Sequence, residues 1–254
     1  MAVHRNKRRR RRRRLGALYA PLSLLLILAA LAAGSLVFFR VNTITVTGNI
    51  RYTQEEILAA AQVETGNNLF RLNKAHMAEE ISLTLPYIRD ISIRRKLPDT
   101  LLIHVEESHA AAAIQGEDGW YLLDARGKLL EQGGEALCRQ APPITGLTPL
   151  SPAVGKGLRV AREDEARLEG LTGLLTALET QNVPPLLTAV DLTAANTISF
   201  SYGGRFTVTL PIRCDHAYKV RVFLYVMEQL EDNETGLIDL TRTDAHFIPQ
   251  QGEV

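Results

Sequence analysis

The chain has 254 residues, of which 46% are apolar and 22% are charged, so it can bury a sizeable core and is neither a disordered chain nor a collagen-like fibre. Its net charge of +1 conceals an asymmetry, because residues 1–14 hold nine of the 29 Lys and Arg residues and no acidic residue. The remaining 20 basic and 28 acidic residues give the rest of the chain a net charge of −8, which excludes a broad basic face for nucleic acid. Residues 1–14 are therefore expected to form a separate basic tail.

The segment after this tail, residues 15–39, contains 25 residues without a charge. About 20 apolar residues suffice for a helix to cross the hydrocarbon layer, so the segment predicts a transmembrane helix, and no later segment has that length. The seven consecutive arginines at residues 8–14 predict a cytoplasmic N-terminus and a bulk on the other side of the membrane, which is a single-pass type II topology. The alternative is a cleaved signal peptide, because residues 32–35 are small, although such peptides normally have an apolar region of only about 7–15 residues.

Residues beyond the predicted span alternate between strand and helix signals. Residues 41–47 are rich in β-branched side chains and end at a Gly-Asn pair, which predicts a strand. Thr53 and Glu56 have the spacing of a capping box and predict the start of a helix. Asn73 can cap a second helix, which Pro86 ends.

A hairpin is expected next. Residues 91–93 and 101–105 alternate apolar and polar side chains on either side of a Pro-Asp turn. The order strand, helix, helix, strand, strand predicts a small α/β domain over residues 40–108, with one face of its sheet covered by helices and the other open.

Residues 109–248 predict a second, mixed α/β domain with an antiparallel sheet, followed by a tail at residues 249–254. A helical stripe of leucines runs through residues 163–180, and a second amphipathic helix is expected over residues 215–232. Between these helices, the Gly203-Gly204 pair separates two alternating segments and predicts a tight hairpin. The chain is therefore expected to be an α+β protein with one transmembrane helix and two outer domains.

Catalytic motifs are not recognisable in the sequence. It has no Gly-x-Ser-x-Gly elbow, no Ser-x-x-Lys, no His-Glu-x-x-His and no phosphate-binding loop. Among the scattered histidines, only His104 and His109 have a metal-ligand spacing, and a surface pair explains them better than a metal site. No catalytic, cofactor-binding or metal-binding residue is therefore predicted. Cys138 and Cys214 lie outside the predicted span, where they could be bridged or could be two free thiols.

Several short motifs resemble the FtsQ/DivIB family of bacterial cell-division proteins. The resemblance to the POTRA domain of that family rests on Val46-Thr47-Gly48-Asn49, Asn68-Leu69-Phe70, Leu85-Pro86-Tyr87-Ile88 and Arg94-Arg95-Lys96-Leu97-Pro98-Asp99-Thr100-Leu101. Further along, Trp120 to Leu130 resembles the hairpin that opens the family's second domain, and Ile238-Asp239-Leu240 resembles its closing strand. This last strand and the short tail after it resemble the DivIB-like members.

The resemblance implies a non-catalytic bitopic scaffold of the division complex, located in the cell membrane at the division septum. It implies partners among bitopic division proteins of the FtsL/DivIC (FtsB) type and, through them, the septal peptidoglycan synthase complex. A membrane-anchored extracytoplasmic hydrolase acting on envelope polymer is the alternative from another functional class. A POTRA-bearing assembly component is a third, but it should carry tandem POTRA units or a barrel of many strands.

A partner-binding segment is predicted near the end of the chain. Unpaired N–H and C=O groups at a sheet edge can be completed by an added strand. The last β-compatible segment is followed by polar residues, so we expect it to be an uncovered edge strand. The predicted partner-binding residues are Leu237, Ile238, Asp239, Leu240, Thr241 and Arg242.

Overall fold

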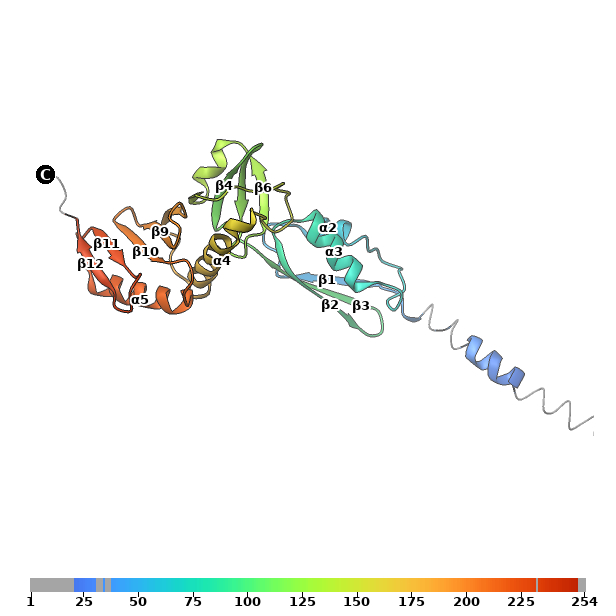
Figure 1. Ribbon diagram of the computed structural model, residues 1–254. Coiled ribbons are helices and arrows are strands. Elements are labelled where there is room, and N and C mark those ends of the chain that lie inside the picture. The colour runs from blue at the N-terminus through green and yellow to red at the C-terminus, as the bar shows by residue number, and fades with distance from the viewer. Residues whose placement is uncertain (1–20, 31–33, 35–37, 232, 251–254) are drawn as a thin grey trace, which may run out of the picture. The chain divides into compact units, whose positions relative to one another are not determined.

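The computed structural model describes residues 21–30, 34, 38–231 and 233–250 (Figure 1). Residues 21–30 are helical, and their side chains are exposed. Within the described ranges, the helices are too short or too polar to cross a membrane. The predicted transmembrane helix over residues 15–39 stays a prediction. Some predictions fall on residues outside the described ranges, namely 1–14, 15–20, 31–33, 35–37, 232 and 251–254.

The described residues divide into two compact units, the first within the bounds Met1–Glu80 and Asp90–Val105 and the second within Ile81–Arg89 and Glu106–Val254. The first unit is built on a three-stranded sheet whose strand order is β1-β3-β2, and α2 and α3 lie on one face of it (Figure 1). The predicted order of strand, helix, helix, strand, strand is confirmed. The bounds are β1 Thr43–Thr47, α2 Gln54–Ala60, α3 Lys74–Thr84, β2 Ile88–Lys96 and β3 Thr100–Glu107.

Local signals place the helices of this unit. The Thr53 hydroxyl accepts from the Glu56 N–H (3.3 Å) and the Glu56 carboxylate accepts from the Thr53 N–H (2.8 Å), so the predicted capping box is confirmed. The Asn73 side chain accepts from the N–H groups of Ala75 and His76, and it caps α3 as predicted. On β3, every second side chain is fully buried, which sets the face that the helices cover.

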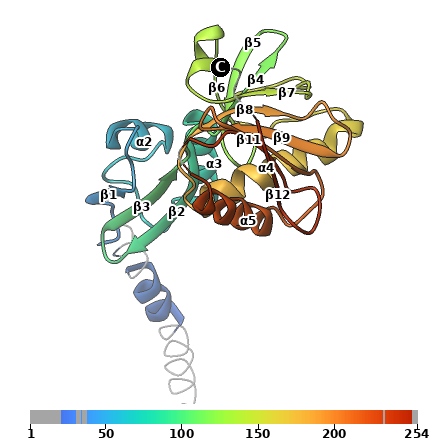
Figure 2. The same ribbon diagram turned by 90° about the vertical axis from the view of Figure 1, so that its left-hand side faces the viewer.

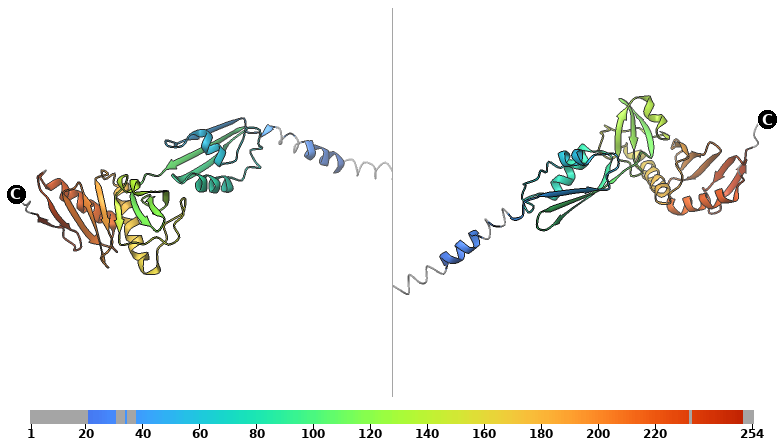
Figure 3. Two further views of the ribbon diagram at one scale, coloured as in Figure 1. Left: turned by 90° about the horizontal axis from the view of Figure 1, so that it is seen from above. Right: turned by 180° about the vertical axis from the view of Figure 1, so that it is seen from behind.

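The second unit contains a nine-stranded sheet in the order β12-β11-β10-β9-β8-β7-β4-β5-β6, and α4 and α5 pack side by side on one face (Figures 2 and 3). Its strands are β4 Ala112–Gly116, β5 Gly119–Leu123, β6 Leu129–Gly133, β7 Pro143–Thr145, β8 Leu187–Asp191, β9 Thr197–Tyr202, β10 Phe206–Pro211, β11 Gly236–Asp239 and β12 His246–Pro249. Its helices are the 3-10 helices η1 Glu135–Arg139 and η2 Arg162–Asp164 and the α-helices α4 Glu165–Thr180 and α5 His216–Gln229.

The core of the second unit lies between this sheet and the two helices. Leucines of the α4 stripe are buried against the strands, as the sequence pattern predicts. Phe223 of α5 makes edge-to-face contacts with Phe200 and Tyr202 of β9, with ring centroids 5.6 and 5.1 Å apart. The predicted β9–β10 hairpin is confirmed, since Gly203 and Gly204 both have the positive φ that a tight hairpin turn requires.

The prediction of an antiparallel sheet is wrong, because the sheet is mixed. Strands β4 and β7, β7 and β8, and β10 and β11 pair in parallel. For two of these pairs the physical reason is the connection, because in chain order α4 joins β7 to β8 and α5 joins β10 to β11. A crossover through a helix returns the chain in the same direction, whereas a short turn reverses it.

The prediction that the segment at residues 237–241 is an uncovered edge strand is also wrong. β11 lies between β10 and a further strand, β12, with which it pairs in antiparallel register from Gly236 opposite Pro249 to Asp239 opposite His246. β12 has only four residues, too few for an alternating pattern to be recognised in the sequence. The sheet edge on this side is therefore β12, and the opposite edge is β6.

Candidate partner-binding edge

The main chain of β12 leaves one side without a strand partner. The Gln250 N–H donates to the Thr235 carbonyl (2.8 Å), and Leu237 lies opposite Ile248 in the register. Hydrogen-bonding directions alternate along an antiparallel pair, so the main-chain groups of Ile248 point toward β11. Those of Phe247 point outward, together with the carbonyl of Pro249. The edge therefore offers one N–H donor and two carbonyl acceptors to an added strand.

The side chains of β12 divide between the two faces of the sheet. Phe247 packs against the core, with its ring centroid 6.2 Å from that of Phe206. Ile248 points to the opposite face and is 53% exposed. Pro249 has no N–H and limits how far a further strand can pair. Sequence reasoning missed this strand, and its signal is the Phe-Ile pair between His246 and Pro249.

The residues predicted to bind a partner are mostly occupied inside the domain. Ile238 and Leu240 are buried in the core, and the Leu240 N–H donates to the Thr209 carbonyl (2.8 Å). Leu237 is half-buried, and because β11 lies between β10 and β12, its main chain pairs within the sheet and is not free for a partner. The Arg242 carbonyl accepts from Lys219 Nζ (2.5 Å), while the Arg242 side chain is exposed.

Asp239 and Thr241 close the turn that follows β11. Asp239 Oδ1 accepts from the Thr241 hydroxyl (2.6 Å) and from the Thr241 N–H (2.8 Å). These two hydrogen bonds lower the pKa of Asp239 below its usual value of 3.8. The carboxylate therefore caps a turn, and the Thr241 N–H is not available to a partner strand.

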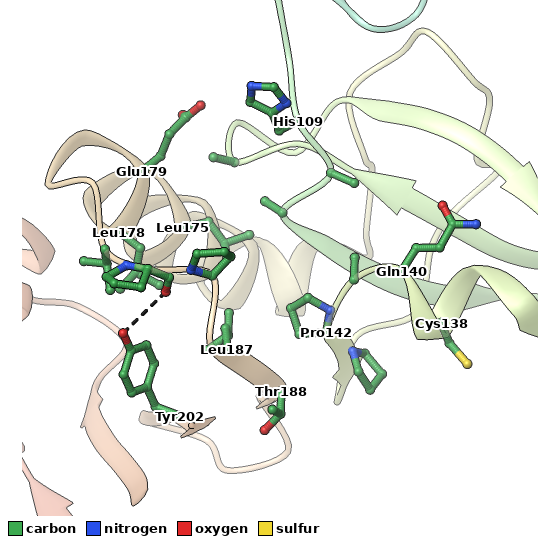
Figure 4. Close-up of a pocket in the computed structure, with 18 of the residues that line it drawn as sticks. His109, Cys138, Gln140, Pro142, Leu175, Leu178, Glu179, Leu187, Thr188 and Tyr202 are labelled. Carbon is green, nitrogen blue, oxygen red and sulfur yellow. Dashed lines mark hydrogen bonds between the residues drawn. The ribbon is translucent and has the colours of Figure 1, made fainter. Parts of the chain in front are cut away.

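A second feature of this unit is a groove of about 890 Å³, lined by the segment just before β4, the end of η1 and the residues after it, the end of α4 and the loop before β8 (Figure 4). Its walls are largely apolar and include Pro142 and Pro184, and the Tyr202 hydroxyl donates to the Pro184 carbonyl (3.4 Å). The His109 ring and the Cys138 thiol lie well apart (Figure 4). They do not form the nucleophile and base pair that covalent catalysis requires.

In the described ranges, His, Cys, Asp and Glu side chains form no group of three that could hold a metal ion. Both cysteines are free thiols, Cys138 donating to the Glu135 carbonyl (2.9 Å) and Cys214 to the Pro211 carbonyl (3.2 Å). Burial raises the pKa of the Cys214 thiol, which makes it a poor nucleophile.

Comparison with known proteins gives one family model and several relatives. The model for POTRA domains of the FtsQ type matches residues 39–108. The chain is 28% identical over 167 residues to cell division protein DivIB of Clostridium botulinum (strain Hall), covering 66% of this chain and 64% of the relative. It is 35% identical over 95 residues to DivIB of Clostridium tetani, covering 37% and 36%. It is 32% identical over 172 residues to cell division protein FtsQ of Syntrophotalea carbinolica, covering 61% and 59%. The chain thus matches less than two thirds of the length of each of these relatives.

Proposed function

Because the chain belongs to the FtsQ/DivIB family of bacterial cell-division proteins, we propose that it is a non-catalytic bitopic scaffold of the division complex. The observation that carries the proposal is the FtsQ-type POTRA domain at residues 39–108, which directly follows the long apolar segment. The scaffold helps to organise septal peptidoglycan synthesis by holding other division proteins and not by catalysis.

Membrane anchoring is part of the proposal. In the helix at residues 21–30, leucine and isoleucine side chains are exposed on all sides, with nothing in the described chain packed over them. A helix that is apolar all round is stable only where an apolar medium surrounds it. We therefore place residues 15–39 in the cell membrane at the division septum, with the basic N-terminus in the cytoplasm and the domains outside.

Partner binding is proposed to take place at β12 by strand addition. Its outward main-chain groups can pair with a β-strand of a bitopic partner of the FtsL/DivIC (FtsB) type, through which the septal peptidoglycan synthase is reached. Ile248 offers an exposed apolar side chain for partner choice. Arg242 is exposed and close in sequence to this edge, whereas Leu237, Ile238 and Asp239 contribute by pairing with β12.

The test removes the outward-pointing N–H group of β12, which belongs to Phe247. Phe247→Pro removes this donor and Phe247→Leu keeps it, while both variants lose the aromatic contact with Phe206. If a partner carbonyl pairs with this N–H, the proline variant should bind the outer segment of a DivIC-type protein more weakly than the leucine variant by about 1–3 kcal/mol, or roughly 5- to 150-fold. Isothermal titration measures the affinities.

Circular dichroism melts of both variants control for folding. Equal affinities in two folded variants would mean that the partner does not use this edge. Imaging a fluorescently tagged copy in dividing cells checks the cellular role, and uniform membrane fluorescence without enrichment at the septum would contradict it.

A further inference from the structure

Three segments of the first unit meet at the end of its sheet where β1 starts and β2 turns into β3. The N–H groups of Asn42 and Thr43 donate to the Asp99 carbonyl (2.9 and 3.3 Å), so the β2–β3 turn lies beside the start of β1. The loop at residues 66–70 lies there too, since the Leu69 N–H donates to the Phe39 carbonyl (2.8 Å). We call this part of the unit the basic end, and it comprises residues 38–42, 64–74 and 94–99.

The basic end exposes apolar side chains that continue from the end of the apolar segment of the chain. The Phe38 and Phe39 rings are 5.2 Å apart, and the Phe39 and Phe70 rings are 4.9 Å apart. Phe70 is 53% exposed, and Leu97 at the hairpin turn is 57% exposed. Arg95 lies over the Phe70 ring at 5.9 Å and donates to the Leu72 carbonyl (2.7 Å), which ties the hairpin to the loop.

The charges around these side chains are mainly positive. Five exposed basic residues lie at the basic end, and in the described ranges none of them forms an ion pair with a carboxylate. They are Arg40, Arg71, Lys74, Arg94 and Lys96. The acidic residues there are Glu64 and Asp99, and the Asp99 carboxylate accepts from the Asn42 side chain (3.2 Å). The surface therefore combines exposed apolar side chains with an excess of positive charge.

We propose that the basic end rests on the anionic phospholipid surface of the bilayer that residues 15–39 enter. This inference rests on the membrane anchoring proposed above. Phe70 and Leu97 lie among the headgroups, and the lysine and arginine side chains bind phosphates around them. A lipid surface fits better than a protein partner because Phe70 lies next to the end of the apolar segment. Its ring contacts the ring of Phe39, which in turn contacts the ring of Phe38. Aromatic and basic side chains at such a boundary are typical of the membrane interface.

The test uses the full chain in lipid vesicles. A nitrobenzoxadiazole label is placed at Leu97→Cys in a chain whose own thiols are removed by Cys138→Ser and Cys214→Ser. The matched control carries the label at Ile50→Cys. Ile50 is 84% exposed and follows the opposite end of β1, where Gly48 lies against the Val105 carbonyl. The two positions are separated by the five residues of β1, roughly 16 Å along the strand.

Vesicles contain phosphatidylglycerol with phosphatidylcholine, and a lipid with a quencher near its headgroup. We expect the label at position 97 to be quenched several-fold more than the label at position 50. The difference should shrink when phosphatidylglycerol is left out and at high salt, because surface attraction is screened. Arg71→Gln should also reduce quenching at position 97, whereas Arg51→Gln, which removes the same charge at the opposite end, should not.

Flotation of the vesicles and resistance to alkaline extraction report the anchor separately. A chain that stays anchored but whose two labels are quenched equally would overturn the docking proposal and leave the anchor intact. A chain that does not float overturns both. A label at position 97 that is shielded from water without lipid quenching would mean that a protein, such as a second copy, covers the basic end, and this would also overturn the proposal.

Discussion

At the scale of single residues, His216 is the buried group with the clearest consequence for stability. It is the first residue of α5, and its Nε2 is buried with no hydrogen-bond partner in the described part of the chain. Burial lowers the pKa of His216 below 6.5, against the opposing effect of the Asp215 carboxylate. The folded protein therefore favours the neutral ring.

This shift predicts a pH dependence. The unfolded chain binds a proton near the ordinary pKa of 6.5, while the folded chain does so only at lower pH. The stabilisation contributed by the neutral His216 ring is therefore fully present above pH 6.5 and is lost as the pH falls from 6.5 through the lowered pKa. His216→Gln should flatten the decrease in melting temperature between about pH 7 and 5. Parallel curves for His216→Gln and wild type would contradict the assignment. The lowered pKa values of Asp191 and Asp239 act in the same direction but below 3.8.

At the scale of secondary-structure elements, α4 depends on glycines as well as on its leucine stripe. A Cβ on Gly173 would lie 2.7 Å from the His216 ring, and one on Gly170 would lie 3.0 Å from the Ile212 carbonyl. Both glycines let α4 approach the segment that leads into α5. The leucine spacing indicates which face is buried, but it does not indicate how closely the neighbouring chain approaches.

Gly173→Ala is therefore expected to destabilise the protein although alanine favours helices. Helix propensity alone would favour alanine by about 1 kcal/mol, and the clash with His216 should outweigh it, for a net loss of about 1–3 kcal/mol. Gly134→Ala is the control, because a Cβ there meets nothing within 4 Å. Urea denaturation of both variants measures the free energies of unfolding. A Gly173→Ala variant as stable as wild type would show that the His216 ring can move aside.

At the scale of the whole molecule, charge asymmetry governs the proposed orientation in the membrane. Replacing several of the arginines at residues 8–14 by Glu should invert or stall insertion, because the cytoplasmic side is no longer marked. Labelling Cys138 with a membrane-impermeant maleimide in intact cells reports which side the second unit occupies. Removing basic residues after residue 40, for example Lys74→Gln with Arg94→Gln, should leave labelling unchanged. Full labelling of the Glu variant would contradict this account.

The sequence by itself determined the local features of this protein, namely where helices start and where a tight turn forms. Thr53 with Glu56 and Asn73 specify helix starts through contacts within three residues, and Gly203-Gly204 specifies a turn through its backbone freedom. The order of elements in the first unit and the resemblance to FtsQ/DivIB proteins follow from such signals.

Only the tertiary structure decided which strands lie side by side. β12 is too short to show a pattern of its own, and its pairing with β11 moved the sheet edge away from residues 237–241. The β7–β8 and β10–β11 pairs are parallel because α4 and α5 carry the chain back across the sheet. Such pairings join residues that are distant in sequence, and they depend on how strands and helices share one core, which no local pattern records.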